Sequence, residues 1–170
     1  AAAVISQDNG SGDFIKDQVT LNDGDAHQYV YYSDGSEDIY VTISWTDVPG
    51  TPPPPSLDPL TKILVNDLDL RVSDNNKTIY YPWNLDPLNP DAAAFTGDND
   101  VDNVETVYIQ NPPAGEYTIE VSHEGPISTQ DYALIIRGLS PDQPGIALDL
   151  KVILEGPFNG MDMNTELNTS

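Results

Sequence analysis

Apolar and polar positions alternate along much of the chain, in short runs separated by turn residues. The clearest run covers residues 39–46, where Ile39, Val41, Ile43 and Trp45 fall in one phase and mostly polar residues fall in the other. Such alternation is typical of a strand with one buried and one solvent-facing side. Comparable runs begin near Ile15, Tyr29, Leu64, Thr78, Val104, Tyr117 and Tyr132. Because helical periodicity is almost absent, we predict an all-β fold, an antiparallel two-sheet jelly-roll-like sandwich of about eight strands.

The chain divides into one large unit and shorter flanking segments. We assign residues 11–138 to the sandwich, residues 1–10 to an N-terminal extension, and residues 139–145, rich in Pro, Asp and Gly, to a linker. Apolar residues alternate again within residues 146–170, so this segment is either an extra strand that docks on the sandwich or the start of a following module. The chain begins with Ala rather than Met and shows no signal peptide, so we expect it to be part of a longer protein.

Two long segments have the composition of loops. Residues 48–55 are rich in proline, which lacks the amide donor that a central strand needs. Residues 82–102 are rich in Pro, Asn, Asp and Ala, and loops of this length are commonly functional or held by an ion. Four aromatic residues lie in or beside the second loop: Tyr80, Tyr81, Trp83 and Phe95. Their rings either anchor the loop on the sandwich or form an exposed platform that binds carbohydrate or insoluble protein.

The charge balance and the residue inventory exclude several classes of function. The chain has 28 acidic and 6 basic residues, a formal net charge of −22, so we expect it to bind neither nucleic acid nor an anionic membrane. No apolar stretch approaches the roughly 18 residues that a membrane helix needs. The absence of cysteine excludes disulfides and thiol nucleophiles. Its two histidines, His27 and His123, accompany no nucleophile elbow, zinc-protease motif or phosphate loop, so we predict that this chain is not an enzyme.

Acidic residues gather in two places, of which the first is the string Asn66-Asp67-Leu68-Asp69-Leu70-Arg71. The leucines take the core phase, which puts Asp67 and Asp69 on the opposite face of a strand. Residues two apart on a strand lie about 6.5–7 Å apart, close enough for one cation to bridge both carboxylates. The alternative is a solvated strand face on which Arg71 is the partner of the two acids.

The second gathering begins at Gly97. Asp98, Asp100 and Asp102 alternate as in the opening of a calcium-binding loop, where oxygen ligands converge on a hard cation. The segment is not an EF-hand, because its sixth position is Asn103 rather than Gly and no helices flank it. The alternative is an acidic loop that is simply solvated.

Glu105 follows this loop and shares its strand phase with Val107 and Ile109. Its carboxylate should therefore point toward the sandwich interior, where it needs a cation, a positive side chain or several hydrogen-bond donors. Since basic residues are scarce, a metal ion is the more available partner. Oxygen ligands without histidine or cysteine favour calcium over zinc or copper.

Several longer segments of the sequence resemble those of a known protein family. They are Ile43-Ser44-Trp45-Thr46-Asp47, Leu64-Val65-Asn66-Asp67-Leu68-Asp69-Leu70, Tyr80-Tyr81-Pro82-Trp83-Asn84-Leu85-Asp86-Pro87, residues 97–105, Asn111-Pro112-Pro113-Ala114-Gly115-Glu116-Tyr117-Thr118 and Gln130-Asp131-Tyr132-Ala133-Leu134. In this order they resemble the accessory β-sandwich that follows the catalytic domain in many secreted bacterial subtilisin-like serine proteases. The resemblance covers about residues 13–138, and that family is related in architecture to the P domain of proprotein convertases.

The resemblance implies a secreted, noncatalytic jelly roll that commonly carries calcium. It marks Asp67, Asp69, Asn103 and Glu105 as functional positions, and the acid pattern adds Asp98, Asp100 and Asp102 as candidate metal ligands. The implied partners are the catalytic domain of the parent protease and a polymeric extracellular substrate, and we expect a monomer. The expected function is a calcium-stabilised accessory module of a protease; the alternative is an adhesion module for carbohydrate or insoluble protein.

Overall fold

The computed structural model describes residues 14–141 apart from residue 58, and of residues 14–17 it describes the backbone alone. The described residues form ten strands and no helix, so none of them builds a helix able to cross a membrane. The strands are β1 (Phe14–Asn22), β2 (His27–Ser33), β3 (Ile39–Trp45), β4 (Asp67–Asp74), β5 (Ile79–Tyr80), β6 (Trp83–Asn84), β7 (Phe95–Thr96), β8 (Val104–Ile109), β9 (Gly115–Glu124) and β10 (Thr129–Arg137).

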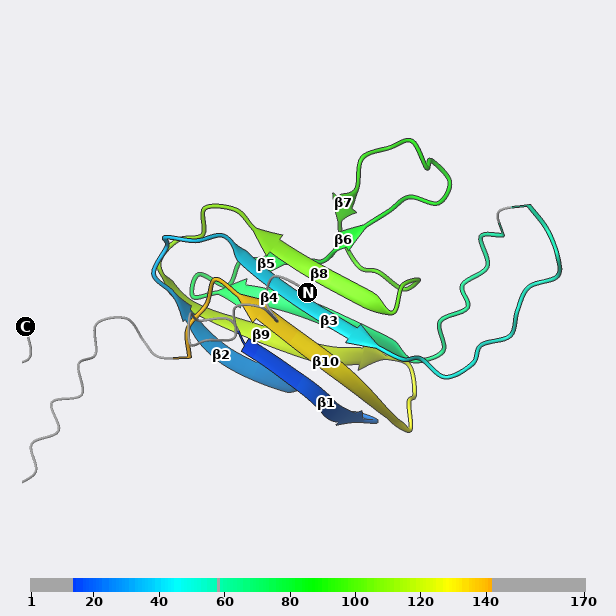
Figure 1. Ribbon diagram of the computed structural model, residues 1–170, viewed down its shortest axis with the longest axis horizontal. Helices are drawn as coiled ribbons and strands as arrows, with labels where there is room; N and C mark the ends of the chain where they lie inside the picture. Colours follow the sequence, from blue (N-terminus) through cyan, green and yellow to red (C-terminus); the bar gives the residue numbers. More distant parts are fainter. Residues whose placement is uncertain (1–13, 58, 142–170) are drawn as a thin grey trace, which may run out of the picture.

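Eight of these strands build two four-stranded antiparallel sheets that face each other (Figure 1). One sheet has the order β1-β10-β3-β8 and the other β2-β9-β4-β5, while β6 and β7 form a separate two-stranded ribbon. Apart from β5, which stays beside β4, each sandwich strand lies in the sheet opposite its predecessor, as in a jelly roll. The predicted all-β, antiparallel two-sheet sandwich is confirmed.

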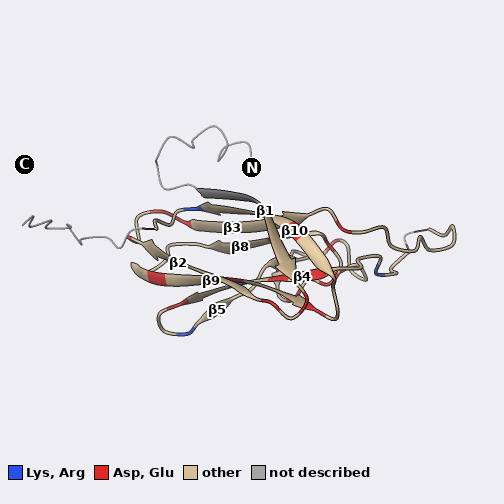
Figure 2. Ribbon diagram, turned by 90° about the horizontal axis from the view of Figure 1, so that it is seen from below, with Lys and Arg blue, Asp and Glu red and all other residues tan. Residues whose placement is uncertain are grey.

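The core lies between the two layers, which Figure 2 shows edge-on. Along β3 the phase predicted from the sequence is the buried one: Ile39, Val41 and Ile43 are fully buried and Trp45 is nearly so. The facing sheet contributes Leu68, Leu70, Val72, Ile119 and Val121 to the same core. Each large apolar side chain buried in this way stabilises the fold by about 1.5–3 kcal/mol.

The chain continues along the sandwich after β10. Leu139 is buried in the core, and Ser140 exchanges two backbone hydrogen bonds of 2.8 Å with Tyr32 of β2. Residues 139–140, expected to begin a linker, therefore lie against the free edge of β2. The predicted N-terminal extension, residues 1–10, and the predicted extra strand or following module, residues 146–170, lie outside the described residues.

Two long loops project from the sandwich (Figure 1). The first joins β3 to β4, and its two ends are tied together by Asp47, whose carboxylate accepts the amides of Val65 (2.7 Å) and Asn66 (2.9 Å). The second lies between β5 and β8 and contains the β6–β7 ribbon, with Trp83 paired to Thr96. The first loop leads into the N-terminal end of β4, which carries the first group of acids, and Lys62 of this loop lies close to Asp67 and to Asp100 of the second loop.

Candidate functional site

The acids of β4 lie at an exposed edge of the sheet. Because β5 pairs only with Val72 and Ser73, the beginning of β4 has a neighbouring strand, β9, on one side alone. The free N–H of Leu70 is bound by the Glu105 carboxylate (2.6 Å), and the Leu70 carbonyl accepts a hydrogen bond from Arg71 (2.9 Å). Charged side chains thus complete an edge that would otherwise expose unpaired backbone groups.

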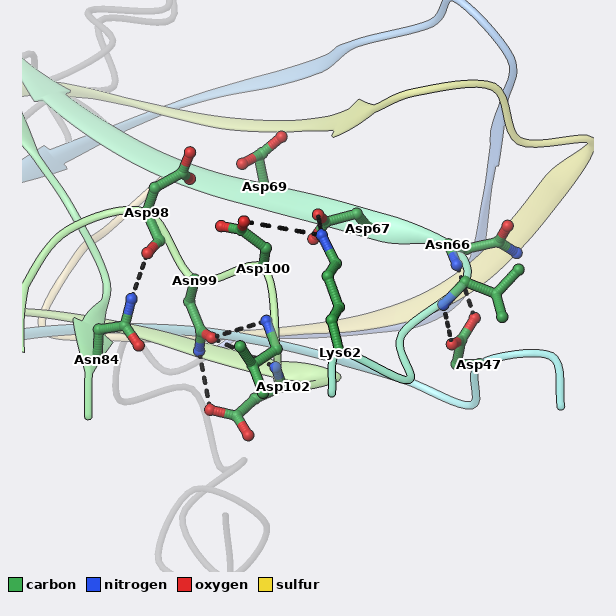
Figure 3. Close-up of polar contacts among 12 residues, drawn as sticks. Asp47, Lys62, Asn66, Asp67, Asp69, Asn84, Asp98, Asn99, Asp100 and Asp102 are labelled. Atoms are coloured by element: carbon green, nitrogen blue, oxygen red, sulfur yellow. Dashed lines mark hydrogen bonds and ion pairs between the residues drawn. The ribbon is translucent and has the colours of Figure 1, made fainter. Parts of the chain in front are cut away.

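The 97–102 loop lies over this edge and brings the two groups of acids together. Figure 3 shows Asp98 and Asp100 of the loop facing Asp69 and Asp67 of β4. Asp67 and Asp69 are only 7% and 8% exposed, so the alternative of a solvated strand face is wrong. Five carboxylates meet here, and we call them the acidic cluster: Asp67, Asp69, Asp98, Asp100 and Glu105.

Two of the six basic residues of the chain enter the acidic cluster. Lys62 Nζ lies 2.6 Å from Asp67 Oδ2 and 3.8 Å from Asp100 Oδ2. The Arg71 guanidinium bonds to Asp69 at 3.0 Å and also to Asp98. Arg71 was the partner expected from the sequence, whereas Lys62 was missed because it belongs to the irregular loop that joins β3 to β4. Two cations do not balance five carboxylates.

Glu105 is the least satisfied member of the acidic cluster. It points into the sandwich, as its phase predicted, and is 1% exposed. Its Oε2 accepts the Leu70 amide, but its Oε1 is buried and has no hydrogen-bond partner. Burial, reinforced by the nearby Asp69 and Asp98 and opposed by the Leu70 amide and Arg71, raises the pKa of Glu105 to about 8. A buried carboxylate oxygen without a partner is uncommon, because its charged form loses hydration without a compensating hydrogen bond.

Electrostatic repulsion also shows in the β4 acids. Burial, with the like charges of Asp98 and Asp67, raises the pKa of Asp69 to about 7 despite the adjacent Arg71. Burial raises the pKa of Asp67 as well, although Lys62 acts against it. For Asp98, burial acts to raise the pKa, but the hydrogen bonds with Arg71 and Asp69 and the positive charges of Arg71 and Lys62 together hold the pKa below its usual range. The acidic cluster therefore favours an additional positive charge.

Two of the predicted metal ligands have other roles. Asp102 accepts a hydrogen bond from Asn99 (3.1 Å), and the Asn99 side chain in turn accepts the amides of Val101 and Asp102 and so shapes the loop. The Asn103 side-chain amide donates to the Trp45 backbone carbonyl (2.7 Å), and the Asn103 backbone carbonyl accepts from the Trp45 backbone N–H (3.1 Å). These contacts join the loop to the end of β3, so the structure does not place Asp102 and Asn103 with the other five.

The oxygen atoms of the acidic cluster are of the chemical type that coordinates calcium. All are carboxylate oxygens, which hard cations prefer, and the unpaired Glu105 Oε1 is available to one. Among the described residues, however, no three Asp, Glu or His side chains are already arranged to hold a metal ion. Lys62 and Arg71 form ion pairs with these carboxylates instead, so a metal ion would have to compete with the two side chains.

The four predicted ligand-binding aromatics divide into two kinds. Tyr80 is half-buried and packs against the core, as the anchoring alternative expected. Tyr81, Trp83 and Phe95 are 40%, 43% and 48% exposed. The Arg71 guanidinium lies 4.9 Å from the centre of the Tyr81 ring, which connects this aromatic to the acidic cluster.

The histidines take part in hydrogen bonds that stabilise the fold. His27 Nδ1 bonds to the Tyr132 hydroxyl at 2.8 Å. His123 Nε2 accepts the Gly24 amide (2.8 Å), while its Nδ1 bonds to the Gly125 carbonyl (2.9 Å), so it joins two turns at one end of the sandwich. These contacts, and the all-β fold itself, fit a noncatalytic domain.

Comparison with known proteins gives one relative and no matching family model. The relative is the serine protease/ABC transporter B family protein tagA of Dictyostelium discoideum, which is 31% identical over 121 residues. The match is to a protein named as a serine protease. It covers 69% of this chain but only 6% of that protein, so the chain corresponds to a small part of its relative. The similarity is consistent with an association with proteases.

Proposed function

We propose that this chain is a noncatalytic, calcium-binding accessory module of a larger secreted serine protease. The protease association is supported by the similarity to a protease-named protein, and it agrees with the resemblance of several sequence strings to subtilisin-like accessory domains. The module would support the stability of the adjoining catalytic domain and contribute to engaging a polymeric substrate. The chain itself supplies no nucleophile–base pair among its described hydrogen bonds.

The observation that carries the calcium proposal is the buried, unpartnered Oε1 of Glu105 beside Asp69 and Asp98. In the folded state, carboxylates are held together in a region with low access to water, and in the unfolded state they separate. A cation that binds only the folded arrangement therefore stabilises the fold, by about 2.7 kcal/mol when its concentration is a hundred times its dissociation constant.

Within the acidic cluster, Asp69, Asp98 and Glu105 would hold the ion, with Asp67 and Asp100 beside it. Calcium bound there supplies a positive charge that neutralises the carboxylates. Arg71 and Lys62 hold the same acids together when no ion is bound, because each bridges one acid of β4 and one acid of the loop.

Calorimetric titration of the full chain with calcium chloride tests the proposal. We expect saturable binding, which Glu105→Gln weakens at least tenfold because Gln retains the size of Glu but not its charge. Asp91→Asn, an exposed change in the same loop region, is the matched control and should leave the affinity unchanged. No binding at millimolar calcium, or equal binding by the wild type and Glu105→Gln, contradicts the proposal.

A further inference from the structure

A cleft of about 350 Å³ crosses the sheet β2-β9-β4-β5 on the side away from the core. Its floor consists of two rows of side chains in cross-strand register. Gln28, Glu120 and Arg71 form one row, and Thr118, Ser73 and Ile79 form the next. Arg71 lines the cleft and also bonds to Asp69 and Asp98, so it lies at the boundary between the cleft and the acidic cluster. Lys77 and Glu120, which line the rest of the cleft, are not members of the acidic cluster.

Lys77 lines one end of this cleft in an unusual backbone conformation. It lies in the β4–β5 turn with φ of +67°, in the left-handed region that favours glycine. The turn is fixed by hydrogen bonds from Lys77 N to the Asp74 carbonyl (3.0 Å) and from Asp74 N to the Thr78 carbonyl (3.1 Å). Glycine would fit this position better, so the presence of a lysine indicates a use for its side chain.

The Lys77 ammonium is also available. Among the described residues, Lys77 forms no ion pair, although acids outnumber bases throughout the chain. It is therefore a hydrogen-bond donor that faces the cleft without a partner carboxylate.

The remaining groups of the cleft complement hydroxyl groups. Glu120 only accepts hydrogen bonds, Lys77 only donates them, and Ser73 and Thr118 do both. Gln28 donates to Glu120 at 2.7 Å, which holds both planar groups in place before a ligand arrives. Since every sugar hydroxyl both donates and accepts, a mixed set of this kind suits a saccharide better than an anion alone.

The apolar side chains of the cleft and the net charge of the chain further restrict the class of ligand. Ile79 and Tyr81 line the cleft with half of their surface exposed and offer contacts to the C–H groups of a sugar ring. The volume lies within the range of small-ligand sites, about 300–1,000 Å³. The net charge of −22 repels anionic polymers. We propose that this cleft binds a neutral saccharide, with Lys77 and Glu120 bonded to its hydroxyl groups.

Calorimetric titration of the full chain with cellohexaose, mannohexaose and chitohexaose tests this proposal. At least one should bind, and Lys77→Gly should weaken that binding about tenfold, as expected for the loss of one charge-assisted hydrogen bond. The same variant should raise the melting temperature by about 2–4 °C, because glycine relieves the strained backbone. A weaker ligand affinity in a more stable protein cannot be attributed to misfolding.

Two further variants complete the test. Glu120→Gln should also weaken binding, whereas Arg137→Gln, on the outer side of the other sheet, should not change it. The proposal is overturned if none of the three oligosaccharides binds, or if Lys77→Gly and Glu120→Gln both retain wild-type affinity. Binding of oligogalacturonate or of an acidic peptide in place of the neutral sugars also overturns it.

Discussion

The properties of the proposed metal site depend on a single residue, Glu105. A carboxylate on an interior strand position would ordinarily be replaced by an apolar residue, as it is at Val107 and Ile109 of the same strand. Its charged form lacks a partner for one oxygen, so the calcium-free fold favours a protonated Glu105. This preference makes the residue a sensitive reporter of bound cations.

The first prediction concerns pH. Because the pKa of Glu105 rises from 4.5 to about 8 on folding, the folded state binds a proton that the unfolded state has released between these values. Stability of the calcium-free protein should therefore fall as pH rises from about 5 to about 8, and Asp69, with a pKa of about 7, adds to the effect. Urea unfolding of the protein at several pH values, with a chelator in the buffer, measures how the unfolding free energy changes with pH.

Glu105→Gln provides the comparison, since it removes the titrating group and keeps its shape. Its stability should decline less with pH than that of the wild type. Calcium should reduce the slope of the wild type and leave that of the variant nearly unchanged. An equal slope in wild type and variant would show that Glu105 does not titrate as described.

A second residue-scale prediction concerns Asp47, which closes the first long loop. Asp47→Ala leaves the amides of Val65 and Asn66 without their acceptor and should lower the unfolding free energy by about 1–3 kcal/mol. Asp91→Ala, at an exposed position of the second loop, should change it by less than about 0.5 kcal/mol. Chemical denaturation of both variants checks the difference, and similar losses would refute this role of Asp47.

Residue-scale features of the site were only partly predictable from the sequence. The strand phase correctly pointed Glu105 inward. The two acid-rich segments singled out in the sequence lie against each other in the structure, but which acids face each other could not be derived from their spacing. The burial of Asp67 and Asp69 was missed, because alternation reports which face of a strand packs on the core and not whether a loop covers the other face. Lys62 was missed for a similar reason: its contact with Asp67 depends on the path of an irregular loop.

At the scale of elements, the turn after β10 directs the chain onto the edge of β2. Gly138 has φ of +78°, and a Cβ there would lie 2.3 Å from the Asp38 carbonyl oxygen. Gly24 has the same φ of +78° but no atom within 4 Å of its Cβ position. Alanine substitutions at the two glycines therefore distinguish the cost of a left-handed backbone, which both positions share, from the cost of a steric clash, which only Gly138 would add.

This comparison gives the third prediction. Gly24→Ala should cost about 1–2 kcal/mol, the cost of placing a Cβ in the left-handed region. Gly138→Ala should cost more than Gly24→Ala, because the strand β3 backbone must also move. Denaturation of the two variants measures both values, and an equal cost would mean that the Asp38 carbonyl does not constrain this turn.

The elements themselves were largely predictable from the sequence, because each strand carries its own alternation. β3, with four buried residues in one phase, is the clearest example. The ribbon β6–β7 was not expected, since two paired residues on each side leave no periodic pattern. The sheet order likewise depends on contacts between distant segments, as in the pairing of β3 with β10.

At the scale of the whole molecule, the dominant feature is the net charge of −22. Acids repel one another more strongly in the compact state than in the unfolded chain, so screening by salt should stabilise the fold. The fourth prediction is that sodium chloride raises the melting temperature moderately, and that calcium raises it further at the same ionic strength. Thermal unfolding monitored by circular dichroism provides the values.

The comparison at equal ionic strength separates general screening from binding at a site. Magnesium should stabilise less than calcium, because it gives up its water ligands reluctantly. Glu105→Gln should retain the response to sodium chloride and lose most of the extra response to calcium. Identical shifts by calcium and by sodium chloride at equal ionic strength would indicate screening alone.

The most direct measurement of the central claim is a crystal structure of the chain grown with calcium, with anomalous scattering used to locate the ion. The account predicts an anomalous peak between β4 and the 97–102 loop, within coordination distance (about 2.3–2.6 Å) of Glu105 Oε1 and of at least one carboxylate oxygen of Asp69 or Asp98. A calcium-replete crystal with no peak there, and with Arg71 still bound to both aspartates, would contradict it.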